Sequence, residues 1–575
     1  MSRFTAFRCG SLSAILAAGV LAATAVPVRA AAPGSFGEPI AAQGGKDLDR
    51  GTLASLFPRQ DPCRKTALRT PPPERRWEVC FALPGGTPAD PQVAVGAGHL
   101  VVTSQAQLAF YAKAGRYLGS LPAARFFALL GLTELGIKSY GDLRAAYDEY
   151  RGRFWVGAMG TSSDRRRAVF AIAVSKSADP LEGWFLYWWH VVDPADPSHR
   201  PGDGADDPAL GIDPLRIHQT STVSNVEPGT DRPFTLVTHF PAQSLANGAK
   251  APVIGRQYRD LRNPDGSPAR GVRPLIHHRP VQGIRDMAAV EGRAFYVNRQ
   301  EDGQVVVWAL QKSSNFVGGV VVQGTQACLP PQNADQKGSP HDQKLDMTSL
   351  GTTILKAVQR NDRITITANE GKNTADSGGD ASWDPPETLT AARVMSIDVV
   401  DAPKLVWTRA IGIRNDFDDG RVVAHYGWPA VEVNQAGHTA VVYTRSGHEL
   451  FPESRYSVFL ADEPDFGASA LLKNGEAPFE IPGNENPVLP WGQAGGASVD
   501  PLDDSLWLTH QSTQAGVRGS SGNSSIWVVK VVLPPPSPIF LRSLQESSGR
   551  AGMPLQRPPR PKGGIPCGSD PWGPG

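Results

Sequence analysis

One short segment recurs along the chain and constrains the fold more than any other feature. In its fullest copy, Asp207-Pro208-Ala209-Leu210-Gly211-Ile212-Asp213, an acidic residue and a stiff turn open an apolar strand. Similar copies start at Asp90, Asp142, Asp286 and Asp346, and Trp428-Pro429-Ala430-Val431 keeps the shape without the acid. The copies lie roughly 50 to 80 residues apart and each opens a β-rich segment, which indicates a propeller with long loops.

The composition agrees with a turn-rich, all-β chain. Its 575 residues include 60 Gly and 51 Pro, which supply many turns, and 13 Trp and 11 Tyr, which suit half-buried strands. Grouping the short apolar strands gives about seven units, within the usual range for propellers. We therefore predict an all-β fold with an about seven-bladed β-propeller over residues 90–533. Because an open edge strand invites aggregation, we expect the strands near Val93 and Val529 to share a blade.

The two ends of the sequence differ from this β-rich body. Arg3 and Arg8 precede an apolar run at residues 12–26 and the small-residue stretch Val28-Arg29-Ala30. This pattern predicts a secretory signal peptide over residues 1–30, because the apolar run is short for a bilayer span. Residues 31–89 are interpreted as an N-terminal arm and residues 534–575 as a Pro-rich tail. The mature chain is expected to be secreted or periplasmic.

Four cysteines remain after the predicted signal: Cys63, Cys80, Cys328 and Cys567. In an exported chain they indicate two disulfides, and three pairings are open. Cys63 with Cys80 is the local choice, and Cys328 with Cys567 would then tie the tail to the body.

The charge balance and the catalytic motifs exclude several classes of function. Lys plus Arg is 57 and Asp plus Glu is 56, so nothing favours nucleic acid or an anionic membrane as partner. No later segment is long and apolar enough to span a membrane, and we expect a monomer. The chain has no zinc-protease, nucleophile-elbow, P-loop or dinucleotide motif. Ser377-Gly378-Gly379-Asp380-Ala381-Ser382-Trp383 has the wrong spacing for a sialidase box.

Several motifs taken in order resemble large secreted bacterial β-propeller proteins, a family without a settled activity. The resemblance spans roughly residues 90–533 and rests on five segments: 142–156, 173–184, 206–213, Trp428-Pro429-Ala430-Val431, and Trp491-Gly492 with Val499-Asp500-Pro501. Two positions depart from the family pattern. Gln493-Ala494 stands where the family tends to have Asp, and Asp207 stands where it tends to have an aromatic residue. The resemblance implies a secreted propeller.

The repeated aspartates are expected to lie at the channel mouth, one in each of five blades: Asp90, Asp142, Asp207, Asp286 and Asp346. Function on a propeller usually sits on the loops at one face. Three interpretations stay open. The carboxylates cap the turn that starts each inner strand, they hold Ca²⁺, the one cofactor considered, or two of them form an acid and base pair for glycoside cleavage.

Other polar and aromatic residues complete the predicted ligand site. Arg285 is placed to pair with a ligand carboxylate or with its neighbours. His425-Tyr426-Gly427-Trp428 would form a sugar-binding surface or ordinary inter-blade packing, with Trp491 and Gln493 in the matching place one blade on. The predicted ligand-binding set is Asp142, Asp207, Arg285, Asp286, Asp346, His425, Tyr426, Trp428, Trp491 and Gln493.

The leading hypothesis is an exported β-propeller that binds a small-molecule or oligosaccharide ligand of carbohydrate type at the channel mouth. One alternative is a hydrolase or lyase that acts on an extracellular polymer. Another is a structural or adhesion protein without a small-molecule site. The sequence leaves open whether the chain is an enzyme, and no catalytic residue is assigned.

Overall fold

The computed structural model describes residues 37–58, 63, 76–81, 90–196, 203–225, 233–250, 252–259, 261–281, 286, 290–325, 328–339, 342–373, 388–412, 424–516 and 522–535. Strands make up 55% of the structure and helices 6%, which confirms the predicted all-β class. The predicted signal peptide, most of the Pro-rich tail, Arg285, Trp383 and Cys567 lie outside the described residues.

The strands form four-stranded antiparallel sets, each named here by its inner strand. The first three sets are β3 (Gln92–Val95), β4 (His99–Thr103), β5 (Gln107–Ala112) and β6 (Tyr117–Pro122); β7 (Ile137–Asp148), β8 (Arg153–Ser162), β9 (Ala168–Ser175) and β10 (Gly183–Val192); and β11 (Asp203–Ile212), β12 (Arg216–Asn225), β13 (Phe234–Pro241) and β14 (Val253–Tyr258).

The remaining sets continue in chain order. They are β15 (Arg273–Pro274), β17 (Ala294–Arg299), β18 (Val305–Leu310) and β19 (Phe316–Val321); β21 (Ile354–Arg360), β22 (Arg363–Asn373), β23 (Thr388–Asp398) and β24 (Lys404–Ile411); β25 (His425–Val433), β26 (Thr439–Gly447), β27 (Leu450–Phe459) and β28 (Ala470–Lys473); and β30 (Gly496–Val499), β31 (Leu506–Thr513) and β32 (Ser524–Val531) with β2 (Arg76–Glu78).

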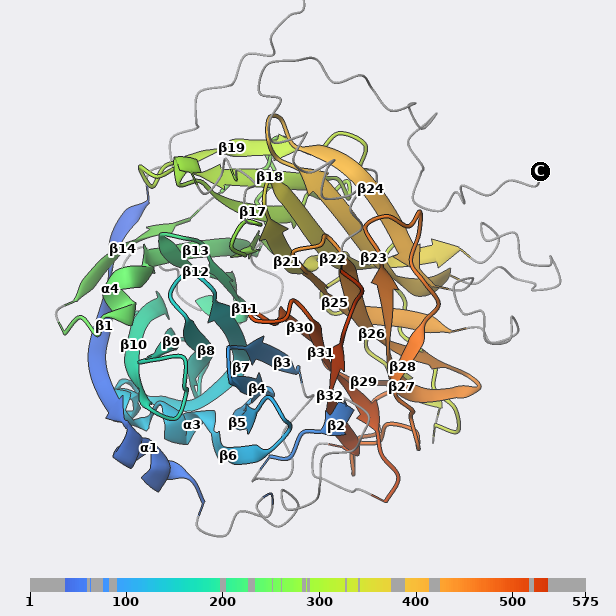
Figure 1. Cartoon of the computed structure of the whole chain (residues 1–575), viewed down its shortest axis with the longest axis horizontal. Coiled ribbons are helices and arrows are strands. Elements are labelled where there is room, and N and C mark those ends of the chain that lie inside the picture. Colours follow the sequence, from blue (N-terminus) through green and yellow to red (C-terminus); the bar gives the residue numbers. More distant parts are fainter. Residues whose placement is uncertain are drawn as a thin grey trace, which may run out of the picture.

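The sets stand around a common centre, with their inner strands facing it (Figure 1). Each inner strand contacts the next, in the order β3, β7, β11, β15, β21, β25, β30 and back to β3. The short β16 (Ile276–His277) follows β15 and pairs in parallel with both β11 and β21. This radial arrangement of four-stranded antiparallel sets is that of a β-propeller.

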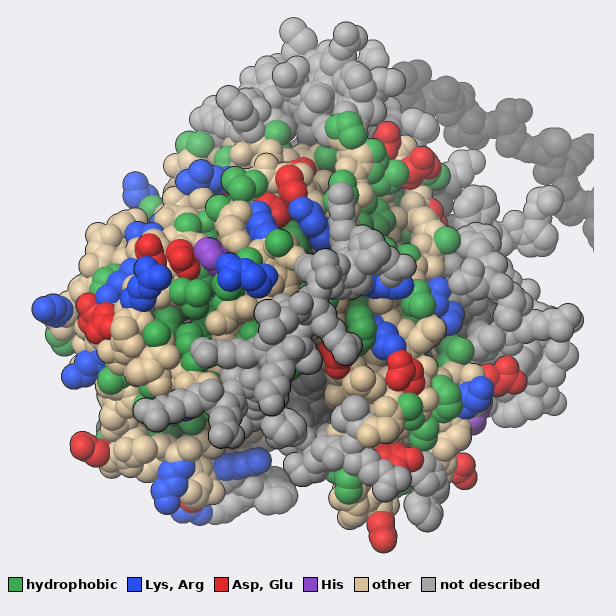
Figure 2. All heavy atoms as spheres, turned by 60° about the horizontal axis from the view of Figure 1, so that its bottom comes forward, with side chains coloured by type: hydrophobic (Ala, Val, Ile, Leu, Met, Phe, Trp, Pro, Cys, Tyr) green, Lys and Arg blue, Asp and Glu red, His purple; other side chains and the backbone are tan. Residues whose placement is uncertain are grey.

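Short elements fill the connections. They are α1 (Arg50–Leu56), α3 (Ala123–Phe126), α4 (Ala242–Ala246), the 3-10 turns η1 (Ala128–Leu130) and η2 (Leu132–Leu135), and the parallel pair β20 (Lys344–Leu345) and β29 (Val488–Leu489). No helix among the described residues has the length and apolar character needed to cross a bilayer. Acidic and basic side chains are intermixed over the face shown in Figure 2, in keeping with the net charge of +1.

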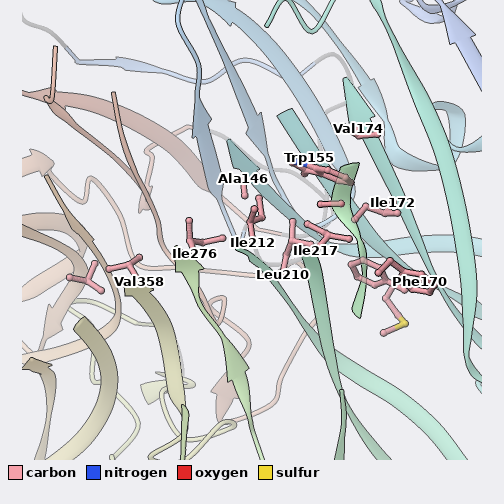
Figure 3. Close-up of a cluster of buried hydrophobic side chains, with 14 of the residues drawn as sticks. Ala146, Trp155, Phe170, Ile172, Val174, Leu210, Ile212, Ile217, Ile276 and Val358 are labelled. Atoms are coloured by element: carbon pink, nitrogen blue, oxygen red, sulfur yellow. The ribbon is translucent and has the colours of Figure 1, made fainter. Parts of the chain in front are cut away.

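The hydrophobic core lies between neighbouring sets. Phe170, Ile172 and Val174 on β9 belong to one cluster, which includes residues of β11 and β12, whereas Ala171 and Ala173 between them belong to another with residues of β5. Side chains of a strand alternate between its two faces, so β9 is buried on both. Figure 3 shows the first cluster joining side chains from several strands around Ile212 and Ile217. This packing explains why residues 168–174 form a continuous apolar run.

Two strands of the N-terminal segment complete the ring. β1 (Glu38–Asp49) lies between β10 and β14 and pairs with both, so it joins two neighbouring sets. β2 pairs with β32 through Trp77 and Val528. The expectation that the strands near Val93 and Val529 share a blade is therefore wrong. They lie in different sets, because β2 takes the outer place beside β32.

The predicted local disulfide is confirmed. Cys63 and Cys80 are bonded, with their Cα atoms 5.6 Å apart. Cys80 also receives support from Tyr111, whose hydroxyl accepts the Cys80 N–H at 2.8 Å. The cross-link therefore closes a loop within the segment that carries β2, and the Tyr111 contact attaches that segment to the β3 set. Cys328 is disulfide-bonded as well.

Candidate functional site

The recurring segment forms a β-bulge near the start of several inner strands. In β7, β11 and β25 the register shifts by one extra residue, because the pairs 142–143, 207–208 and 428–429 each oppose a single residue of the neighbouring strand. Each bulge opens on a left-handed residue: Asp142 at φ 51°, Asp207 at φ 51° and Trp428 at φ 56°. Asp90, which precedes β3, has φ 30°. Asp tolerates this region better than most residues, which explains part of its recurrence.

A cavity of about 680 Å³ opens at this end of the channel, a volume typical of small-molecule sites. We call it the mouth cavity. Four carboxyl groups, from Asp90, Asp142, Asp206 and Asp346, line it with one cation, Arg165. Hydrogen-bonding and aromatic groups line it too: Gln105, Ser139, Tyr140, Thr161, Ser224, Trp491 and Gln493. The residues come from loops or strands of several sets, so the cavity belongs to the ring as a whole.

Asp142 is the least compensated carboxyl of the mouth. Among the described residues, no hydrogen-bond donor or cation is paired with it. Burial raises the pKa of Asp142 to about 7, Arg144 opposes the rise, and the nearby charges of Asp206, Asp90 and Asp207 add to it. A carboxyl with such a pKa holds its proton up to near neutrality, and it then offers both a donor and an acceptor.

Three other aspartates of the recurring segment are each engaged. Asp90 is buried and accepts the backbone N–H groups of Gln493 and Ala494, the latter at 3.1 Å. Asp207 accepts two hydrogen bonds from Arg273, at 2.7 and 2.6 Å. Asp346 accepts the N–H groups of the two residues that begin the following turn, at 2.8 and 3.0 Å. Turn capping, the first of the three interpretations, therefore describes Asp346 but not Asp207.

Asp286 does not lie at the mouth, contrary to the sequence prediction. It follows β16, and its carboxylate contacts His277 Nε2 at 2.7 Å in a buried pair. The inner strand of this set is β15, whose Arg273-Pro274 carries no acid, so the repeat was matched to a segment beyond the inner strand. The neighbouring Arg285 lies outside the described residues.

The predicted aromatic surface is mostly interior. His425, Tyr426, Trp428 and Trp491 are all less than 5% exposed. The indole N–H of Trp428 donates to the Asp346 carbonyl at 3.0 Å, and that of Trp491 donates to Thr444 Oγ1 at 2.8 Å. Trp491 still reaches the wall of the mouth cavity, and Gln493 lines it with its amide donating to Ser349 Oγ at 3.0 Å. His425, Tyr426 and Trp428 do not line it.

A second, smaller cavity of about 50 Å³ lies on the inner strands, beyond the mouth. We call it the inner cavity. It shares Gln493 with the mouth cavity, and the consecutive residues Asp206 and Asp207 line the mouth and the inner cavity respectively. Its charged residues are Arg144, Asp207, Arg273 and Lys356. The sequence prediction missed both Arg144 and Lys356, because isolated cations inside strands carry no motif.

A buried charge network lies at the opposite end of the inner strands, which we call the closed end because its charged groups are buried and paired with one another. His278 contacts Glu149 through Nδ1 and Glu432 through Nε2, each at 2.7 Å, and Arg360 lies 3.6 Å from Glu149. Burial alone would lower the pKa of His278, but Glu432 and Glu149 raise it to about 9. Burial alone would raise the pKa of Glu149, but His278 and Arg360 hold it at about 2. This network joins the ends of three inner strands.

A second acidic repeat at this closed end was also missed. Asp148 and Asp500 each end an inner strand and accept the backbone N–H two residues on, both at 2.9 Å. Each also accepts the indole N–H of the Trp seven residues on, Trp155 at 3.3 Å and Trp507 at 3.2 Å. The shared spacing of Asp and Trp is visible in the sequence and could have identified these capping residues.

The calcium interpretation finds no support in the described part of the chain. No group of three or more His, Cys, Asp or Glu side chains is placed there to hold a metal ion.

No known protein family matches the sequence, and no curated protein is similar to it. Solved structures are similar at low identity. A lectin, BP39L, from Burkholderia pseudomallei is 12% identical, with 77% of this chain and 96% of that chain covered and a TM-score of 0.37. An α-L-arabinofuranosidase from Fusarium graminearum is 11% identical, with 79% and 97% covered and a TM-score of 0.34. A GH43 endo-arabinanase from Bacillus licheniformis is 13% identical, with 57% and 99% covered and a TM-score of 0.27.

Proposed function

We propose that this chain is an exported β-propeller of seven blades that binds a carbohydrate-type ligand in the mouth cavity. The observation that carries the proposal is the lining of that cavity. Carboxyl, amide and hydroxyl groups converge there from several sets, with Tyr140 and Trp491 beside them. Sugar hydroxyls both donate and accept hydrogen bonds, so a wall that offers carboxylates, amides and a protonated carboxyl together suits them.

The architecture and the location belong to the same proposal. Each four-stranded set is one blade, and β2 supplies the outer strand of the last blade. Residues 31–89 act as an arm that closes the ring and is fastened by the Cys63–Cys80 disulfide. A disulfide of this kind suits an oxidising compartment, which supports a secreted or periplasmic protein released from the signal peptide over residues 1–30. The chain acts as a monomer, and residues 534–575 form a tail.

Glycoside hydrolysis is the second candidate, and one observation favours it. The pKa of Asp142 is about 7, as a general acid requires, and the exposed Asp206 lines the same cavity. In this role Asp142 would protonate the leaving oxygen and Asp206 would act as the base or nucleophile. The two candidates share a site and differ in whether the bound glycan is cleaved.

Thermal unfolding of the mature protein with a panel of neutral and acidic oligosaccharides tests binding. A ligand that binds only the native state raises the melting temperature, by an amount that grows with its concentration relative to Kd. We expect at least one glycan to raise it for the wild type and not for Asp142→Asn. Glu463→Gln serves as the matched control, because Glu463 is exposed in the turn that follows β27. This variant should respond like the wild type.

Release of reducing ends from the glycan that binds best separates the two candidates. If the chain is a hydrolase, Asp142→Asn and Asp206→Asn each reduce the rate by about 100-fold or more. Binding without any release leaves the chain as a lectin-like protein. If no glycan of the panel shifts the melting temperature of the wild type, the proposal of a carbohydrate ligand fails.

A further inference from the structure

The two adjoining cavities of the channel carry opposite charge. Four carboxyls and one cation line the mouth cavity. Three cations, Arg144, Arg273 and Lys356, line the inner cavity with a single carboxylate, Asp207. Arg273 and Asp207 pair with each other at 2.6 Å. This pairing leaves two positive charges without a carboxylate partner in a space of about 50 Å³.

Lys356 is the more exceptional of the two cations. It lies at an irregularity of β21, where the register shifts between Ile354 and Lys356, and its side chain is partly exposed to the channel. Within the described residues, no carboxylate or hydrogen-bond acceptor pairs with its ammonium. Burial lowers the pKa of Lys356, Glu432 raises it and Arg144 lowers it further. A desolvated ammonium without a partner costs free energy that a bound anion would recover.

Arg144 is held in place by the backbone instead of by an acid. Its Nε donates to the Pro208 carbonyl at 2.7 Å, and its NH1 group donates to the Leu143 carbonyl at 3.2 Å. Both carbonyls belong to entrance bulges of neighbouring inner strands. These bonds fix the guanidinium but do not neutralise it, and in the described part of the chain no carboxylate lies within ion-pair distance of it.

We propose that the inner cavity binds the carboxylate of an acidic sugar, with Lys356 and Arg144 as its cationic partners, while the rest of the ligand occupies the mouth cavity. The inference rests on the proposed function and specifies its ligand class as uronic-acid glycans. A water molecule needs about 10–15 Å³ of space measured in this way. The inner cavity therefore has room for one carboxylate group but not for a sugar ring.

The mouth does not repel such a ligand as strongly as its four carboxyls suggest. Asp90 is buried and saturated by two backbone N–H groups. Asp346 is saturated by its own turn. Asp142 is largely neutral below pH 7. Arg165 lies on the same wall and offsets the remaining carboxyls in part, so the mouth repels an anionic glycan only modestly on its way to the two cations.

Calorimetric titration with matched acidic and neutral glycans tests the inference. The probes are oligomers of galacturonate, mannuronate and glucuronate, each paired with its methyl ester, which removes the charge and keeps the sugar. We expect at least one acidic oligomer to bind about tenfold or more tightly than its ester. Lys356→Gln should abolish that preference and leave the binding of the ester within about threefold of the wild type. Lys312→Gln, an exposed lysine elsewhere, should keep the preference.

The outcomes separate the inference from the proposed function. If esters or other neutral glycans bind as tightly as the acids, the chain is a carbohydrate-binding protein and the inference is overturned. If Lys356→Gln keeps the tenfold preference, the assigned residue is wrong. If inorganic phosphate binds to the wild type and no glycan does, the cavity is a site for free anions, and both proposals fail.

A stability measurement without ligand guards against a variant that fails to fold. Lys356→Met removes a desolvated charge and keeps the length of the side chain, so we expect it to unfold at a higher urea concentration than the wild type. Lys312→Met should leave the midpoint unchanged. A loss of stability in Lys356→Met would show that the ammonium is already satisfied by the protein, and it would contradict the inference.

Discussion

The two ends of the channel contain similar residue types but treat their charges in opposite ways. At the closed end, Glu149 and Glu432 both contact His278, and Arg360 lies nearby. At the mouth, Asp142 has no such partner among the residues that the structure describes, and Asp206 is exposed. The consequence is visible in the pKa values: Glu149 is held at about 2, whereas Asp142 is raised to about 7.

The paired and the unpaired charges lie at opposite ends of the same inner strands. β7 contributes Asp142 at its mouth end, and Glu149 follows directly on its last residue, so a single strand carries both environments. A saturated network contributes nothing to a ligand, because its donors and acceptors are already used. A carboxyl without a protein partner beside a cavity is free to bind a ligand or to transfer a proton to it. The comparison therefore supports the mouth as the proposed ligand site, and the following three experiments test it.

The largest effect is expected from breaking the closed end. His278→Ala leaves two buried carboxylates without their shared cation, which should cost about 3–5 kcal/mol in the free energy of urea unfolding at pH 6. The pKa of His278 is raised to about 9, so its contribution is complete below the unfolded value of 6.5 and is lost as the pH rises through 9. The cost should therefore shrink at pH 10.

His448→Ala is the matched control for that change. His448 also contacts a carboxylate, Asp335 at 3.2 Å, but its side chain is 76% exposed. An exposed pair of this kind is worth at most about 1 kcal/mol. Equal losses in the two variants would contradict the view that the closed end is a structural network.

A smaller effect is expected from Asp207, the aspartate of the recurring segment that is paired with an arginine. Arg273→Met removes the partner of Asp207, and both side chains are mostly buried. We expect a loss of about 2 kcal/mol in unfolding free energy, since one carboxylate stays behind in the channel. The double change Arg273→Met with Asp207→Asn should recover part of this loss. A double-mutant cycle by urea unfolding measures the coupling free energy between Arg273 and Asp207. A coupling near zero would show that Asp207 gains no stability from Arg273, and that it resembles the unpaired Asp142.

The smallest effect is expected from Asp142→Asn, and its sign depends on pH. Because the folded pKa is about 7 and the ordinary value is 3.8, the folded wild type loses stability as the pH rises from about 4 through 7. The Asn variant has no such loss. Unfolding at pH 4 and pH 8 should show the variant gaining about 1–2 kcal/mol relative to the wild type, after allowance for solvent screening. Parallel pH profiles would show that Asp142 is already ionised at pH 4.

The fold was largely predictable because its signals are local. The Asp-Pro copies at 90 and 207, and the Trp428-Pro429 copy, mark the entrance of inner strands, as the left-handed φ of their first residues explains. The local disulfide was predictable from the short spacing of its cysteines. Ring closure was not predictable, because β2 is three residues long and only its partner identifies it as a strand.

The candidate site was predictable in part. The sequence placed Asp142, Asp346, Trp491 and Gln493 in one group, and all four line the mouth cavity. It left open whether Trp428 faces a ligand or packs between sets, because an aromatic residue in a repeat looks the same in both places. No sequence signal indicated that Lys356 and Arg144 belong to a site, since the two cations lie on separate strands and come together only in the fold.

The pairing of β2 with β32 has a consequence for how the chain reaches its native state. These strands come from near the two ends of the described chain. Their pairing therefore joins residues that are very far apart in the sequence. Such contacts carry a high loop-closure entropy and raise the contact order, which slows folding. During synthesis, β2 must wait for β32 before it can pair. A chain cut short of β32 would keep its earlier blades in an open ring. The unpaired edge strand of that ring would promote aggregation.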